Sequence, residues 1–174
     1  RVSMKYAYFV SASIACGKSS FIKIANELGF ESLSADLIAN EITQKNAAVL
    51  AEMFLLNLDK EGKIDKKALA NLIFKDKKAK EKLENFMHPK IREELLRKMQ
   101  ILEQKGHIFF VELPLFFESD FYKNLGKSVL IYAPKNVSLQ RLMQRDGLDK
   151  DEALRRIKSQ MDIEKKREMA DFVI

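Results

Sequence analysis

Short apolar stretches alternate with amphipathic ones along most of the chain. The apolar stretches that predict strands are residues 6–10, 30–35, 107–113, 128–133 and 171–174. Between them, apolar positions recur at helical spacing, from Gly17 to a stop signal at Gly29 and again over residues 137–145. Strands separated by helices predict an α/β fold, in which a parallel sheet is covered by helices on both faces.

The middle of the chain has helical spacing alone. Its last and longest segment starts at His88-Pro89, because proline suits a first helical turn, and it ends near Gly106. Lysines and acids alternate over residues 74–84, which is typical of a solvated helix face. We therefore expect one domain, with its parts in the following ranges. The core takes residues 4–46, 106–136 and 169–174, an inserted helical lobe residues 47–105, and a lid region residues 137–168.

The stretch SASIACGKSS, residues 11–20, ends like a phosphate-binding loop, whose pattern is Gly, four residues, then Gly-Lys-Ser or Gly-Lys-Thr. Gly17, Lys18 and Ser19 fit the end of the pattern, but Ala12 replaces its first glycine. An alanine at positive φ costs on the order of 1 kcal/mol. A predicted strand before the loop and a helix after it favour a working site over a decayed one. Lys18 would then reach the phosphates, and the Ser19 hydroxyl would bind Mg²⁺.

Five other side chains have both a chemical and a structural interpretation. Asp36 follows a strand, at the sheet edge where ligands bind, but it equally suits a helix N-cap. Glu112 ends a strand, where it could either bind Mg²⁺ or position a water molecule, or merely carry a charge at the strand end. His88 could cap a helix or meet a substrate anion. Arg141 and Arg145 share a helix face and suit either phosphate neutralisation or a solvated helix pair.

Composition limits the class of protein. The net charge of +6 indicates an anionic partner, with nucleic acid, a phosphorylated metabolite and a membrane surface all open. The single cysteine excludes an internal disulfide and fits a reducing compartment. No apolar run reaches the roughly 18 residues that span a bilayer, so we expect a cytoplasmic protein. Residues 1–3, ahead of Met4, are expected to be a vector remnant.

In their order along the chain, these motifs resemble those of the dephospho-CoA kinases. That family typically carries TGGIGSGKST, DAD, HP at a helix start, PLLFE, Arg-x-x-x-Arg-Asp, RI with a nearby Gln, and AD-x-VI. The corresponding stretches here are SASIACGKSS, SADLIAN, MHPKIREE, VELPLFFE, QRLMQRD, RRIKSQM and ADFVI. The resemblance covers Tyr6 to Ile174, and a chance match of seven ordered motifs is improbable.

The resemblance implies a P-loop NTPase-like fold and ATP-dependent phosphorylation of the ribose 3′-hydroxyl of dephospho-CoA, the last step of coenzyme A synthesis, with Mg²⁺. The implied ATP-binding residues are Ala15, Cys16, Gly17, Lys18, Ser19, Ser20, Arg141 and Arg145. The implied substrate-binding residues are His88, Pro89, Pro114, Leu115 and Glu118. The implied catalytic residues are Asp36, as base, and Lys18, with Ser19 and Glu112 for the metal. The implied partners are ATP and dephospho-CoA, with no nucleic acid and no membrane. The chain is expected to be a monomer or a weak homo-oligomer.

Three features depart from the family pattern. Ser34 stands where the first acid of DAD is usual, so a second carboxylate for Mg²⁺ must come from elsewhere, with Glu112 as the candidate. Asn40 replaces a usual arginine or histidine at a substrate-phosphate contact, and Ile174 ends the chain where relatives continue into a helix. Another small P-loop kinase, acting on a nucleoside monophosphate or a small alcohol, is the alternative. A nucleotide-responsive binding protein without catalysis is a third hypothesis, but the chain lacks an RNA-binding signature.

Overall fold

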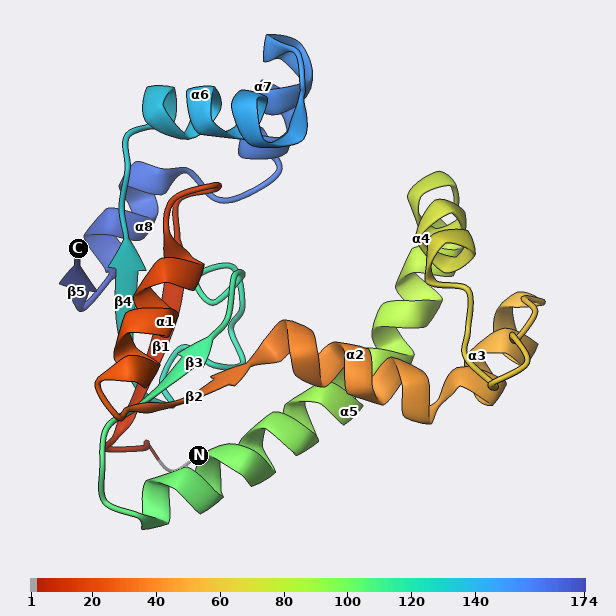
Figure 1. Ribbon diagram of the computed structural model, residues 1–174, viewed down its shortest axis with the longest axis horizontal. Coiled ribbons are helices and arrows are strands. Elements are labelled where there is room, and N and C mark those ends of the chain that lie inside the picture. Colours follow the sequence, from red (N-terminus) through yellow and green to blue (C-terminus); the bar gives the residue numbers. More distant parts are fainter. Residues whose placement is uncertain (1–2) are drawn as a thin grey trace. The chain divides into compact units, whose positions relative to one another are not determined.

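The structure is a computed structural model that describes residues 3–174 (Figure 1). The chain forms two compact units. One contains the residues up to Ser34 together with Met99–Ile174, and the other is Ala35–Lys98. Of the expected vector remnant, residues 1–2 lie outside the described residues.

The first unit is built on a five-stranded parallel sheet with the order β2-β3-β1-β4-β5. The strands are β1 (Ala7–Ala12), β2 (Glu31–Ser34), β3 (Phe109–Glu112), β4 (Lys127–Ile131) and β5 (Phe172–Val173). Phe9 and Val10 of the central strand β1 are fully buried, and Phe9 stacks on Phe116 with 4.8 Å between ring centroids. Because all strands are parallel, the loops that follow β1, β3 and β4 leave the same edge of the sheet. The predicted α/β fold is confirmed.

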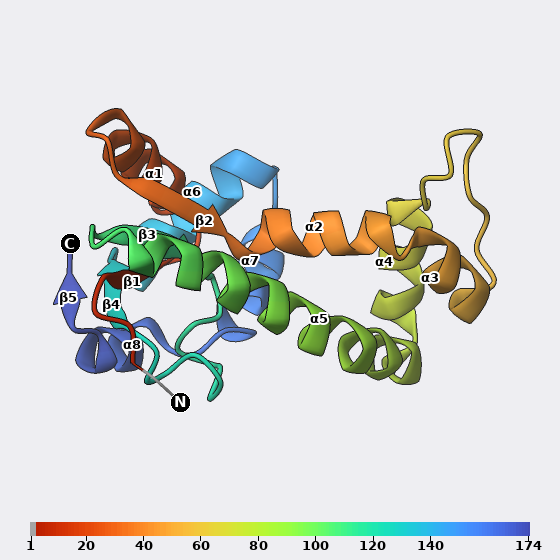
Figure 2. The same cartoon turned by 90° about the horizontal axis from the view of Figure 1, so that it is seen from below.

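Four helices belong entirely to this unit. They are α1 (Lys18–Glu27), α6 (Lys135–Asp146), α7 (Lys150–Lys158) and α8 (Ile163–Met169). Helix α1 ends at Glu27, Leu28 is its C-cap, and Gly29 follows with a left-handed φ of 92°, as the predicted stop signal requires. Figure 2 shows α1 and α8 on opposite faces of the sheet, so the predicted covering of both faces is confirmed.

The second unit is helical, as predicted for the middle of the chain. It contains α2 (Ala35–Lys45), α3 (Ala47–Phe54), α4 (Lys66–Lys75) and most of α5 (Lys77–Gln104). Its buried apolar residues include Ile38, Ile42, Leu50, Leu69 and Leu95. Within the unit, the only β pairing is an isolated bridge between Leu58 and Ile64. The compact unit includes α2, which packs against α3, and the predicted bounds of the lobe, residues 47–105, stay a prediction.

The predicted start of the long helix at His88-Pro89 is wrong. Helix α5 begins at Lys77, and Pro89 lies in its interior. The side chain of Asp76 caps the helix, since its Oδ1 accepts hydrogen bonds from the backbone N–H groups of Lys78 (2.9 Å) and Ala79 (3.3 Å). An interior proline costs about 3 kcal/mol, but the lysine- and glutamate-rich turns before it favour helix strongly enough to continue. The capping interpretation of His88 is therefore wrong as well.

Over residues 3–174, no helix is both long and apolar enough to cross a bilayer.

Candidate phosphate-binding site

The predicted phosphate loop connects the central strand to α1. Strand β1 ends at Ala12, α1 begins at Lys18, and Gly17 is the N-cap with a left-handed φ of 78°. No side chain caps α1, and its first turn holds no acidic residue. The N–H groups of that turn therefore offer hydrogen bonds and partial positive charge to an anion.

The backbone φ angles show which positions of this loop take the left-handed conformation that favours glycine. Ala12 belongs to β1 and is not among the described residues with positive φ, so the missing first glycine is not required. Ala15 instead takes a left-handed φ of 60°, which is unfavourable for alanine by about 1–2 kcal/mol. The strain expected at Ala12 therefore lies at Ala15.

Side chains from the loop bind it to the end of β4. The backbone N–H of Ser13 donates to the carbonyl of Ile131 (2.8 Å). Its Oγ donates to the Ala133 carbonyl (2.9 Å) and accepts from the Ala133 N–H (2.8 Å). The Sγ of the buried Cys16 lies 3.3 Å from Ser138 Oγ in α6. These contacts hold the loop against the end of β4 and against α6, although the loop lacks the usual glycines.

A hollow of about 450 Å³ opens over the loop. It is lined by residues 12–20 together with Pro114, Arg145 and Gln160. The structure thus brings together the six predicted loop residues, Pro114 and Arg145. Arg141 does not line this hollow, although it lies on the same helix. Gln160 was not predicted as a site residue, and its only sequence signal is the glutamine of the motif RRIKSQM.

Arg145 is held by a neighbouring acid. Its Nε donates to Asp146 Oδ1 at 2.9 Å, and Arg156 Nη1 contacts Asp146 Oδ2 at 3.0 Å. The hydrogen bond from Arg145 lowers the pKa of the Asp146 carboxyl, and the same bond raises the pKa of the Arg145 guanidinium. Arg155 pairs with Glu152. Within the lid region, residues 137–168, Arg145 thus lines the hollow over the phosphate loop, while Arg155 and Arg156 form surface ion pairs.

Ser19 also lines a second hollow, of about 530 Å³, together with other residues of α1. Glu112, the last residue of β3, lines it too, so the two residues predicted for Mg²⁺ line the same hollow. Residues 3–174 contain no cluster of three or more His, Cys, Asp or Glu side chains suited to a metal. Two oxygen donors without a full cage suit Mg²⁺, which usually takes its other ligands from phosphates and water.

The segment after β3 holds three of the predicted substrate-binding residues. The carbonyl of Pro114 accepts a hydrogen bond from Ser11 Oγ at 2.8 Å, and Leu115 is 52% exposed. The carboxylate of Glu118 lies 3.0 Å from the ammonium of Lys166, which is fully buried. The structure therefore gives Glu118 an ion-pair partner inside the protein.

The other predicted site residues lie in the helical unit. Asp36 is the second residue of α2, which starts at Ala35, so its N-cap interpretation is wrong. His88 and Pro89 are exposed on α5. Asn40 Oδ1 accepts a hydrogen bond from Lys66 Nζ at 3.4 Å, so a lysine now lies beside the position where an arginine or histidine was expected.

Comparisons with known proteins show which family this chain is similar to. The sequence model of the family "Dephospho-CoA kinase" matches residues 9–174. A dephospho-CoA kinase of Campylobacter jejuni is 56% identical over 98% of this chain and 88% of that protein, and one of Helicobacter pylori is 37% identical over the same shares. The solved structure of a Campylobacter jejuni dephospho-CoA kinase covers 98% of this chain and 88% of its own, at 55% identity and a TM-score of 0.81. A Thermus thermophilus protein, TT1252, gives 30% identity and a TM-score of 0.82 over the same shares.

Proposed function

Because the chain belongs to the dephospho-CoA kinase family, which catalyses the final step of coenzyme A synthesis, we propose how its residues divide that reaction between them. The phosphate loop and Arg145 hold the phosphates of ATP, and the γ-phosphoryl passes to the ribose 3′-hydroxyl of dephospho-CoA. The observation that carries this assignment is the hollow in which Lys18, Ser19 and Arg145 meet at the uncapped N-terminus of α1.

Phosphoryl transfer asks the protein mainly for positioning and charge neutralisation. The loop N–H groups surround the phosphate oxygens, Lys18 supplies an ammonium for the β- and γ-phosphates, and Arg145 adds a guanidinium from α6. The hydrogen bond from Arg145 Nε to Asp146 Oδ1, at 2.9 Å, orients the guanidinium in advance. Binding the phosphates therefore costs Arg145 less side-chain entropy. Arg141, which does not line the hollow, is assigned no contact with the phosphates.

Mg²⁺ is the metal that the donor set favours, and Ser19 Oγ with the Glu112 carboxylate would hold it. When bound, the ion neutralises charge on the β- and γ-phosphates. Glu112 compensates for the missing acid at Ser34, since the two residues are register partners in β3 and β2. The carboxylate that the family usually carries on β2 is thus supplied from the adjacent strand.

On the acceptor side, Asp36 accepts or orients the proton of the 3′-hydroxyl. It stands two positions after Ser34 in sequence, at the carboxyl end of a parallel strand, and matches the second acid of the DAD motif. His88, Pro89 and Leu115 are the proposed contacts for the remainder of dephospho-CoA. The expected monomeric or weakly oligomeric state and the cytoplasmic location stay predictions.

Acceptor competition tests this assignment. ADP release would be followed with ATP, Mg²⁺ and each of three acceptors: dephospho-CoA, a nucleoside monophosphate and a small alcohol. We expect turnover with dephospho-CoA to exceed that with the other two. Faster turnover with either of them would move the chain to a different small P-loop kinase activity. Salt-dependent nucleic-acid binding without any turnover would support the binding protein instead.

A further inference from the structure

Lys166 is the one charged residue that the structure buries completely among residues 3–174. It is 1% exposed, and its Nζ lies 3.0 Å from Oε1 of Glu118, whose side chain is 23% exposed. Burying an ion pair costs several kcal/mol per charge in desolvation, which the attraction between the charges only roughly offsets. Net stability therefore gives little reason for this pair, which suits a role in holding other groups in place.

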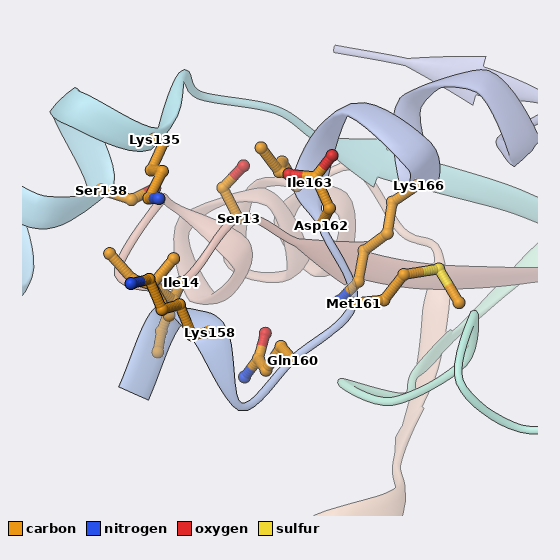
Figure 3. Close-up of a pocket in the computed structure, with 11 residues that line it drawn as sticks. Ser13, Ile14, Lys135, Ser138, Lys158, Gln160, Met161, Asp162, Ile163 and Lys166 are labelled. Atoms are coloured by element: carbon orange, nitrogen blue, oxygen red, sulfur yellow. The ribbon is translucent and has the colours of Figure 1, made fainter. Parts of the chain in front are cut away.

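At one end of the pair, Lys166 lies in α8, directly after the connection from α7. Its backbone N–H donates to the carbonyl of Asp162 at 3.1 Å. The connection lines a hollow of about 310 Å³ with Gln160 and Met161 (Figure 3). The figure shows the Lys166 side chain reaching from α8 towards this connection. Gln160 also lines the phosphate hollow, so it belongs to both.

At the other end, Glu118 belongs to a segment anchored in the core. Ser11 Oγ contacts the carbonyls of both Leu113 (2.9 Å) and Pro114 (2.8 Å), and Phe116 stacks on the fully buried Phe9. Pro114, at the start of this segment, lines the phosphate hollow. The ion pair thus joins the two chain segments that contribute Pro114 and Gln160 to one site.

We propose that Lys166 is a positioning residue for the kinase reaction. It acts through Gln160, and this role rests on the phosphate site proposed above. The pair with Glu118 fixes the α7–α8 connection against the anchored segment, and this holds the Gln160 side chain at the phosphates. A glutamine amide can donate to a phosphate oxygen without adding charge, beside Lys18 and Arg145. A buried ion pair suits such a role because it demands one geometry from both partners.

A double-mutant cycle between Lys166 and Gln160 tests this coupling. Lys166→Met keeps the length and apolar stem of the side chain but removes the charge, and Gln160→Ala removes the amide. We expect each to lower kcat/KM for ATP by about 10- to 100-fold, with KM for dephospho-CoA unchanged. If Lys166 acts through Gln160, the double variant loses no more than about twofold beyond Gln160→Ala alone. Lys165→Met, at an exposed position of the same helix, is the matched control and should keep normal kinetics.

Two results would overturn the role of Lys166: independent losses that multiply in the double variant, or normal kinetics of Lys166→Met. If Lys166→Met does not fold, the same cycle is run with Glu118→Gln, which keeps an acceptor for the lysine but removes the partner charge. Turnover by the unmodified chain and its loss in Lys18→Ala report on the phosphate site itself. A failed cycle with those two results intact therefore refutes the positioning role alone.

Discussion

Removing the Ser13 hydroxyl should destabilise the fold out of proportion to its size. Ser13 is 4% exposed, and its Oγ both donates to the Ala133 carbonyl (2.9 Å) and accepts from the Ala133 N–H (2.8 Å). Ser13→Ala removes both hydrogen bonds just after β4, so the buried carbonyl and N–H of Ala133 lose this partner. Each of the two groups costs about 1–3 kcal/mol, so we expect a loss of about 2–6 kcal/mol in the free energy of unfolding.

Urea denaturation, followed by circular dichroism, measures this loss. Ser32→Ala is the control, because the Ser32 Oγ makes a single exposed hydrogen bond, to Asn26 at 3.1 Å, and its loss should cost under about 0.5 kcal/mol. Because the Ser13 bonds hold the phosphate loop to β4, KM for ATP should rise in Ser13→Ala and stay normal in Ser32→Ala. A Ser13→Ala variant as stable as its parent, to within about 0.5 kcal/mol, would refute the reasoning that these bonds fix the loop.

Three further outcomes follow from the site. Ala15→Gly removes the strain of a left-handed alanine, about 1–2 kcal/mol, but it adds unfolded-state entropy that costs about 0.4–1 kcal/mol. The variant should therefore be more stable by about 0.5 kcal/mol in urea denaturation. A less stable variant would contradict the φ of 60° at Ala15. Asp36→Asn should lower kcat by about 100-fold or more while calorimetry shows unchanged ATP affinity, and near-normal kcat would remove Asp36 as base. The Asp146 carboxyl, with its pKa lowered by the Arg145 hydrogen bond, should titrate below its ordinary value of 3.8 by NMR. Its contribution to stability is present above that value and is lost as pH falls through the lowered pKa, and Asp146→Asn should abolish this dependence.

The sheet and the phosphate loop could be predicted because their signals are local. A buried apolar run followed by Gly-Lys-Ser and a helical repeat needs no distant partner to be recognised, and both β1 and α1 occur where expected. The strand-end position of Glu112 followed from the same pattern, and parallel pairing then brings it into the hollow shared with Ser19.

Two predictions are wrong where a longer element overrides the preference of one position. Pro89 predicts a helix start, but the helix-favouring turns before it carry α5 through it. The strain expected at Ala12 lies at Ala15, because β1 continues to the first motif position and the turn comes later.

Gln160 could not be recognised as a site residue from periodicity or composition. It stands between two helices and reaches the loop only because β4, α6 and α7 return the chain to the same sheet edge. The burial of Lys166 is hidden in the same way, since the segment EKKREM reads as a solvated basic helix and Glu118 lies 48 positions earlier. Such contacts depend on the tertiary arrangement rather than on spacing along one element.

The central claim is that the loop lacking its first glycine is a working site for ATP phosphates during transfer to dephospho-CoA. The most direct measurement is formation of coenzyme A from ATP and dephospho-CoA by the unmodified chain, by Lys18→Ala and by Lys123→Ala, which changes an exposed lysine away from the loop. We predict turnover in the first and third, with kcat/KM of Lys18→Ala lower by about 100- to 1,000-fold. Equal activity in all three, or no coenzyme A from the unmodified chain, would contradict it.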